Sequence, residues 1–240
     1  MLELILNQPE KRNALSAAMI AELTDFAGTI GDDPSVRAVI LSGHGKVFCA
    51  GGDLNWMRQQ IDADRKTRIT EATKLATMLR VLNEMPVPLI GKIHGGAFGG
   101  GVGLASICDT VVAADTAKFG LTETRLGLIP ATIGPYVIAR MGEGMARHVF
   151  MSARIFDAFE ARQLGLVNEV CPESDLGDIA HFYAKPYLST KPRAVSAAKA
   201  LARKLGPKID DATIQTSIEA LADVWDDPEA LAGVKAFFKE

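Results

Sequence analysis

Two clusters of glycine, each placed after a short apolar segment, constrain the fold of this chain more than any other feature. The first cluster is FCAGGDL (48–54), which follows the apolar segment 37–41, and the second is HGGAFGGGVG (94–103), which follows residues 87–93. Short apolar runs that end at such breakers are typical of buried strands. Ligands of open α/β sheets bind at the carboxyl ends of the strands, so both clusters are expected at a ligand-binding edge.

The rest of the chain alternates between apolar segments and segments of helical periodicity, which predicts an α/β fold with a mostly parallel sheet. Ser16 is a suitable N-cap for a first helix, and Met85-Pro86 is expected to end a helix over residues 70–84. Additional strands are expected at residues 2–7, 109–114 and 165–170, and C-terminal helices at 192–205, 210–223 and 228–239. We therefore expect an α/β core over residues 1–180 and a helical region over residues 181–240.

Composition narrows the class of protein. The chain has 240 residues, 48% hydrophobic and 23% charged, with a net charge of -3. These values are typical of a globular protein, and the balanced charge gives no reason to expect nucleic acid as a partner. No apolar run approaches the ~18 residues of a membrane span, and the N-terminus lacks the pattern of a signal peptide, so a cytoplasmic location is expected. Three widely spaced cysteines predict neither disulfides nor a metal site.

The glycine clusters suit a particular kind of chemistry. Glycine allows backbone N–H groups to approach a ligand closely, and one N–H from each cluster would form a pair of donors for a developing oxyanion. The alternative is that the glycines serve only tight turns and close packing. A dinucleotide site is disfavoured, because the second cluster contains no GxGxxG pattern and the chain contains no P-loop motif.

Glu123 is the best candidate for a catalytic carboxylate. It lies among apolar residues and glycines in the segment 119–130, where few polar partners are near in sequence. Partial burial would raise its pKa and suit it to proton transfer near neutral pH. The alternative is a surface ion pair with Arg125, and local features do not separate the two.

Together, several motifs resemble the enoyl-CoA hydratase/isomerase (crotonase) superfamily, and the resemblance extends over nearly the whole chain. It rests on NQPEKRNAL (7–15), on the two glycine clusters, on the segment 119–130 and on AxxxGLV (161–167). It implies a spiral of ββα units with a C-terminal helical region that mediates trimerisation and covers the active site. It also implies a homotrimer or a dimer of trimers.

The same resemblance implies a coenzyme A thioester substrate and no separate cofactor, because coenzyme A is part of the substrate. Gly52 and Gly100 would supply the oxyanion hole, and Glu123 the acid/base. Trp56 and Met57 would form a wall of the acyl pocket. Further residues implied to contact the substrate or coenzyme A are Lys11, Arg12, Ala14, Ala50, Gly51, Asp53, Leu54 and Gly99.

One position departs from the family pattern. Gly103 stands where a typical hydratase has its first glutamate, which leaves three possibilities: hydration by Glu123 alone, double-bond isomerisation by Glu123, or replacement of the missing group by another residue or by the substrate. A coenzyme A ester-binding protein with little catalysis is a further alternative. The segment 130–137, together with Gly103 and residues 52–57, resembles bacterial methylglutaconyl-CoA hydratases, which act on branched esters with a distal carboxylate in branched-chain amino acid degradation. Under that reading, Gly103 frees space for a branch, and Arg125 or Lys92 meets the distal carboxylate.

Overall fold

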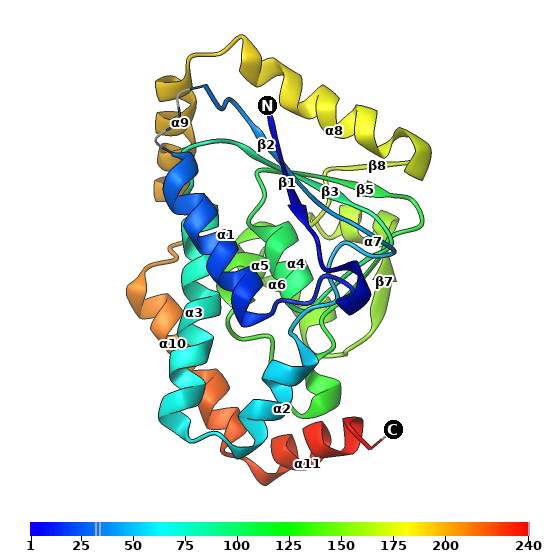
Figure 1. The fold of residues 1–240 in the computed structure, drawn as a ribbon, viewed down its shortest axis with the longest axis vertical. Helices are drawn as coiled ribbons and strands as arrows, with labels where there is room; N and C mark the ends of the chain where they lie inside the picture. The colour runs from blue at the N-terminus through cyan, green and yellow to red at the C-terminus, as the bar shows by residue number, and fades with distance from the viewer. Residues whose placement is uncertain (32, 34, 240) are drawn as a thin grey trace.

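A parallel five-stranded sheet forms the centre of the molecule in the computed structural model, which describes residues 1–31, 33 and 35–239 (Figure 1). The strand order is β1-β2-β3-β5-β8, and every neighbouring pair is parallel. The strands are β1 (Leu2–Leu6), β2 (Val39–Gly43), β3 (Leu89–Ile93), β5 (Thr110–Ala114) and β8 (Glu169–Cys171). The predicted parallel sheet is confirmed.

Helices cover both faces of this sheet, and its strand β2 is accordingly buried on both sides. Val39 and Leu41 face the main core, which also contains α1 (Ala17–Ile30) and α3 (Arg65–Glu84). Ile40, between them, faces a smaller cluster with Ala180 of α8 (Leu176–Ala184), as the alternation of strand side chains requires. The boundary expected at residue 180 lies within α8, and the division into two regions remains a prediction.

The helix ends follow local capping. The Ser16 hydroxyl accepts a hydrogen bond from Met19 N at 3.3 Å, which confirms the predicted N-cap of α1. Helix α3 begins five residues earlier than predicted, because the Asp64 carboxylate caps it by accepting from Thr67 N at 2.8 Å. The three predicted C-terminal helices are present as α9 (Pro192–Leu205), α10 (Asp211–Trp225) and α11 (Pro228–Phe237).

A second, three-stranded sheet was not expected from the sequence. It has the order β4-β6-β7, with β4 (Gly96–Phe98), β6 (Lys118–Gly120) and β7 (Ile155–Asp157). Its first strand lies inside the second glycine cluster, where no strand was predicted. These strands have three residues each, too few to give a period-two pattern that sequence reasoning can detect.

The strand expected over residues 165–170 is also shorter than predicted. Gly165 has a φ of +81°, so the chain turns there and β8 begins only at Glu169.

The remaining helical elements are α2 (Leu54–Asp62), α4 (Gly100–Ser106), α5 (Gly134–Met141), α6 (Glu143–Phe150), α7 (Ala158–Gln163) and the 3-10 helices η1 (Pro9–Lys11), η2 (Glu123–Leu126), η3 (Glu173–Asp175) and η4 (Lys185–Leu188).

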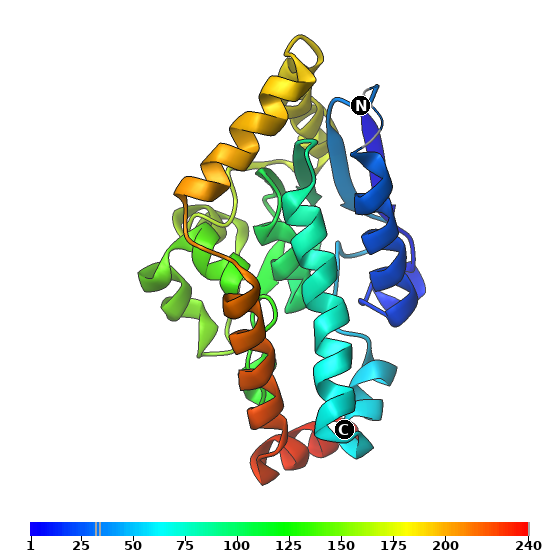
Figure 2. The ribbon, with the colours of Figure 1, turned by 90° about the vertical axis from the view of Figure 1, so that its left-hand side faces the viewer.

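The C-terminal helices return to the core as an arm. Helix α10 runs alongside α3, and α11 then turns across the end of the molecule to reach α2 and η2 (Figure 2). Trp225, at the end of α10, is 2% exposed and packs with Leu128, Ala230 and Val234. This arm therefore covers α2, which follows the first glycine cluster, and η2, which carries Glu123.

Candidate active site

Three segments distant in the sequence meet at the ends of the small sheet. The parallel pairing of β4 with β6 places Phe98 beside Gly120, and Gly99 N donates to Gly120 O at 2.9 Å. A parallel bridge joins Cys49 to Ala97, with Phe98 N donating to Cys49 O at 3.0 Å. Both glycine clusters and the turn that carries Glu123 are thereby held side by side.

The amides of Gly52 and Gly100 are placed as a pair of hydrogen-bond donors. Leu15 bonds to the residues on either side of Gly52: its N–H donates to Gly51 O at 2.7 Å, and its carbonyl accepts from Asp53 N at 3.4 Å. In a parallel bridge this pattern turns the N–H of the middle residue, Gly52, away from Leu15. Gly100 N is in the first turn of α4, where amides have no partner within the helix.

These two amides lie close together. A Cβ built on Gly100 would stand 3.8 Å from the carbonyl carbon of Gly51, which is the atom bonded to Gly52 N. Among the residues that the structure describes, neither amide donates to a backbone carbonyl outside the helices and strands. Two free N–H groups at adjacent turns match the requirement for stabilising one oxyanion.

Glu123 faces the same place. It begins η2, and its Oε1 lies 2.9 Å from where a Cβ on Gly99 would stand. Its Oε2 is buried without a hydrogen-bond partner in the described structure, and burial raises the pKa of the carboxyl group to about 7. The alternative of a surface pair with Arg125 is wrong, because the Arg125 guanidinium donates instead to Ala153 O at 3.1 Å.

Glycine at positions 51 and 99 allows the segments of the site to approach each other this closely. Gly99 has a φ of +46° and Gly51 a φ of +96°, which are backbone conformations that other residues rarely adopt. A Cβ on Gly99 would press on the Glu123 carboxylate, and a Cβ on Gly51 would stand 2.9 Å from Phe98 O. Glycine at these positions therefore has a steric reason that concerns the site itself.

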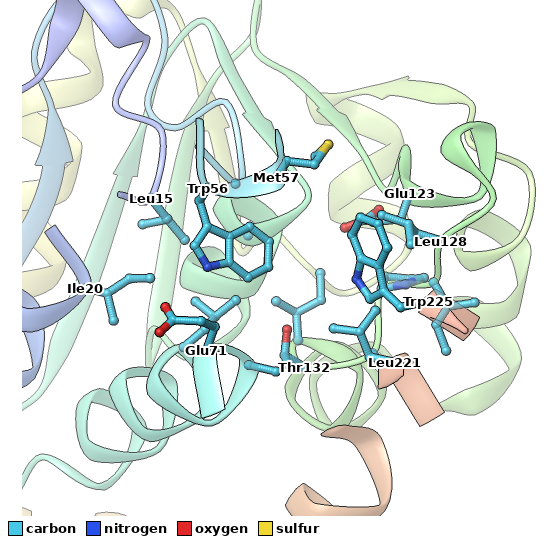
Figure 3. A pocket seen from close by; sticks show the side chains of 18 residues that line it. Leu15, Ile20, Trp56, Met57, Glu71, Glu123, Leu128, Thr132, Leu221 and Trp225 are labelled. Carbon is cyan, nitrogen blue, oxygen red and sulfur yellow. The ribbon is translucent and has the colours of Figure 1, made fainter. Parts of the chain in front are cut away.

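A mainly apolar cavity of about 110 Å³ opens beside Glu123 (Figure 3). Glu123, Leu128 and Trp225 lie on one side of it, and Trp56 and Glu71 on the other. The expectation that Trp56 and Met57 line an acyl pocket agrees with their positions in its wall. Wall residues that sequence reasoning missed are Ile20, Glu71, Ala72, Leu75, Leu128, Ile129, Ala131, Thr132, Ile133, Leu221 and Trp225.

These missed residues come from α1, α3, the segment after η2 and α10, which converge only in the folded chain. Their sequence signal, an apolar stripe on a helix, is the same for a residue that packs in a core and for one that lines a cavity. Nothing in the local pattern distinguishes Trp225 from an ordinary core tryptophan.

The space expected beside Gly103 is filled. A Cβ on Gly103 would stand 3.0 Å from Ile133 Cβ and closer still to Ile133 Cγ2. Ile133 is 2% exposed and lines the cavity, so it occupies the volume that the missing side chain would take. The expectation that Gly103 opens room for a branched substrate is therefore wrong.

The two cations expected near a distal carboxylate lie elsewhere. Lys92 Nζ is 4.0 Å from Glu3 Oε2 on the main sheet, and Arg125 is held at the Ala153 carbonyl. Neither lines the cavity, and its described wall contains no lysine, arginine or histidine. The cavity thus offers no positive charge to an acyl chain.

The residues expected to contact coenzyme A divide into two groups. Arg12 and Ala50 line an open groove with Lys46 and Phe98. Ala50 and Phe98 each precede an oxyanion-hole glycine by two residues, so the groove and the cavity lie at the same pair of loops. Lys11 and Leu54 are exposed outside both hollows.

Two other residues that were expected to contact coenzyme A, Ala14 and Asp53, have a structural role in the fold. Ala14 is buried at 7% exposure. The Asp53 carboxylate accepts from Trp56 N at 3.0 Å and caps α2.

Cys49 and Cys108 are buried thiols whose pKa burial raises to about 12, so they are poor nucleophiles.

Comparison with known proteins places this site in a family. The family model described as enoyl-CoA hydratase/isomerase matches residues 1–239, and the chain belongs to this family. The mouse mitochondrial enoyl-CoA hydratase domain-containing protein 2 is 32% identical over 98% of this chain and 80% of its own length.

Solved structures agree with this assignment. A crystal structure of an enoyl-CoA hydratase from Shewanella pealeana matches with a TM-score of 0.82 and 33% identity, covering 99% of this chain and 90% of the other. An enoyl-CoA hydratase from Mycobacterium smegmatis matches with a TM-score of 0.82 and 32% identity, covering 99% and 92%. The protein is therefore an enzyme of the enoyl-CoA hydratase/isomerase family with a crotonase fold.

Two further findings concern the described residues only. No helix among them is both long and apolar enough to span a bilayer. They also contain no group of three or more histidine, cysteine, aspartate or glutamate side chains placed to hold a metal ion.

Proposed function

We propose that this protein is an enoyl-CoA hydratase that adds water reversibly to a 2-enoyl-CoA thioester, with Glu123 as its single acid/base. One observation carries the proposal: the buried, unpartnered Glu123 carboxylate lies against Gly99, beside the free amides of Gly52 and Gly100. A proton-transfer group and an oxyanion hole are thus brought together at the mouth of an apolar cavity.

The chemistry follows from this arrangement. Ionised Glu123 takes a proton from water while the water oxygen bonds to C3 of the substrate. The electron pair of the C2–C3 double bond moves toward the thioester, and the charge on the carbonyl oxygen is stabilised by Gly52 N and Gly100 N. Protonated Glu123 then returns the proton to C2, which regenerates the carboxylate and completes the addition of one water molecule.

Glu123 is the best placed carboxylate for this role. Glu71 also lines the cavity, but Lys74 Nζ binds its Oε1 at 2.6 Å, and it lies across the cavity from Glu123. The Gly103 position is closed by Ile133. One group therefore performs both proton transfers, in place of the pair that the family pattern leads one to expect.

The acyl group that best suits the cavity is uncharged and apolar. Leu75, Leu128, Ile133, Leu221 and Trp225 make up much of its wall. A distal carboxylate would lose its hydration there without a cation to compensate. We therefore consider 3-methylglutaconyl-CoA, the substrate suggested by the resemblance of residues 130–137, a poorer candidate substrate than uncharged 2-enoyl-CoA esters.

The remaining features of the proposal concern the surroundings of the site. The groove with Arg12 and Lys46 would hold the phosphates of coenzyme A through charge-assisted hydrogen bonds. No separate cofactor is required, because the reaction exchanges only water and protons. We retain the cytoplasmic location as part of the proposal.

We also retain the homotrimer or dimer of trimers. Large apolar side chains such as Phe182 (67% exposed) and Leu205 (78%) would be covered by neighbouring subunits. Light scattering coupled to size exclusion would measure the mass of the assembly.

A panel of acyl-CoA esters tests the function directly. We expect loss of the conjugated enoyl absorbance with a linear, uncharged 2-enoyl-CoA and formation of the 3-hydroxyacyl ester. Appearance of conjugation from a 3-enoyl-CoA, without hydroxyacyl product, would instead show an isomerase. Thermal stabilisation by acyl-CoA without turnover of any ester would show a binding protein.

A further inference from the structure

The turn that carries Glu123 is covered by one face of α11. This face consists of Ala230, Gly233 and Val234, which are three and four residues apart and so lie on one side of the helix. Ala230 and Val234 are fully buried, in a cluster that also contains Leu126 and Leu128 on either side of Gly127. Helix α11 therefore packs directly on η2.

The contact between α11 and η2 is closer than side chains would allow. A Cβ on Gly233 would stand 2.7 Å from the carbonyl carbon of Leu126 and closer still to its oxygen. On the other side, a Cβ on Gly127 would stand 3.0 Å from Ala230 Cα and 3.1 Å from Glu229 O. Two glycines thus face each other's backbone, and neither clash can be relieved by rotating a flexible side chain.

Glu123 is tied to this contact through its own backbone. Its carbonyl accepts a hydrogen bond from Leu128 N at 3.0 Å, and Gly127 N donates to Thr124 O at 3.2 Å. A displacement of Leu126 or Gly127 would move the turn at whose start Glu123 stands. We propose that Gly233 is a positioning residue, which lets α11 pack closely on η2 and so keeps the Glu123 carboxylate turned into the cavity and shielded from bulk solvent.

A second set of contacts, between α2 and the end of α11, also holds α11 in place. The Arg58 guanidinium of α2 lies 4.6 Å from the ring centroid of Phe238, directly after α11, and Met57 and Ile61 of α2 join the same apolar cluster. Helix α11 and Phe238 therefore cover both the cavity wall and the turn that carries Glu123. A lifted α11 would admit water to both.

Admission of water changes Glu123 in a predictable direction. Burial is the cause that raises its pKa, and no charged neighbour is among the causes. Hydration would therefore move the pKa of Glu123 down toward its ordinary value of 4.5. Besides Glu123 itself, the charged residues of η2 and of α11, which packs on it, are Arg125, Glu229 and Lys235, and Glu71 is the other charged residue in the cavity wall.

The test compares two glycine-to-alanine changes in helices. Gly233→Ala introduces the clash with Leu126, whereas Gly144→Ala, at an exposed position of α6, meets nothing within 4 Å and is the matched control. The titration of Glu123 is followed by infrared spectroscopy on protein labelled with 13C-glutamate, and its signal is identified by its loss in Glu123→Gln. We expect the pKa of Glu123 to fall by at least about one pH unit in Gly233→Ala and to stay unchanged in Gly144→Ala.

Kinetics provides the second readout. We expect Gly233→Ala to lower kcat by about a hundredfold, with a smaller change in KM, because a shift of about 1 Å in a catalytic group has an effect of this size. A purely structural role for Gly233 would lower the melting temperature and leave the titration of Glu123 in place. That outcome would overturn the proposal.

A second variant keeps the test decisive if Gly233→Ala fails to fold. Val234→Ala loosens the seat of α11 without adding an atom, and the same fall in the pKa of Glu123 is expected. The inference rests on the proposed role of Glu123, but the infrared titration requires no substrate. Absence of hydratase activity in the unchanged protein would refute the proposed function, and an unmoved titration in Val234→Ala would refute the role of α11.

Discussion

Ile133 occupies the space that a side chain at position 103 would need, since a Cβ on Gly103 would stand 3.0 Å from Ile133 Cβ. The two residues therefore form a matched pair: the glycine removes one carboxylate from the site, and the isoleucine replaces it with apolar wall. This pairing means that the missing glutamate cannot be restored by a single substitution.

Gly103→Glu is accordingly expected to destabilise the protein and not to increase turnover. Overpacking of a buried site alone costs about 1–3 kcal/mol, and an unpaired buried carboxylate adds to this. Urea unfolding measures the loss. In the double variant Gly103→Glu, Ile133→Gly, part of the stability should return because the clash is removed; equal stability of the two variants would show that Ile133 is not the obstacle.

The rate of the reaction should depend on the ionisation of Glu123. Burial raises the pKa of this carboxyl group to about 7, and the mechanism starts from its ionised form. In the free enzyme, kcat/KM should therefore rise about tenfold per pH unit below pH 7 and level off above it. A profile already level from pH 5 upward would contradict the assignment, and Glu71→Gln, as a control, should keep the same midpoint.

The raised pKa also affects stability. Between about pH 4.5 and pH 7 the folded protein binds a proton at Glu123 that the unfolded chain has released, so stability attributable to this group falls as the pH rises through this window. Glu123→Gln removes the effect. The variant should gain up to about 3 kcal/mol relative to the unchanged protein between pH 4 and pH 8, as measured by denaturant unfolding. A difference that stays constant with pH would indicate a hydrated Glu123.

Coenzyme A binding should depend on the groove next to the site. Arg12 lines this groove, whereas Lys11 lies next to it in the sequence but outside the lining. We expect Arg12→Ala to weaken acyl-CoA binding by about tenfold, as loss of one charge-assisted contact would. Lys11→Ala serves as the comparison and should have a smaller effect. Isothermal titration at two salt concentrations measures both, and equal losses would place the phosphates elsewhere.

Much of the site was predictable because its residues are tied to backbone requirements. Gly52, Gly100 and Glu123 stand in motifs whose glycines are explained by close approach and positive φ, and the structure brings all three segments together. The main sheet was predictable from its apolar segments for a related reason, since buried parallel strands must be apolar on both faces.

What the sequence did not predict depends on contacts between distant segments. The small sheet has strands too short to show a period, and the filling of the Gly103 space by Ile133 involves residues thirty positions apart. The role of α11 likewise appears only when Gly233 is seen against Leu126. Spacing within a motif carries no information on such contacts.

The central claim is that one carboxylate, Glu123, performs both proton transfers. The most direct measurement is the turnover of a linear 2-enoyl-CoA by Glu123→Gln, together with the affinity of the same variant for the 3-hydroxyacyl-CoA product. We predict that kcat falls by a factor of at least about 10² to 10⁴ while the dissociation constant changes by less than about threefold. Turnover within about tenfold of the unchanged protein would contradict the claim and point to another acid/base.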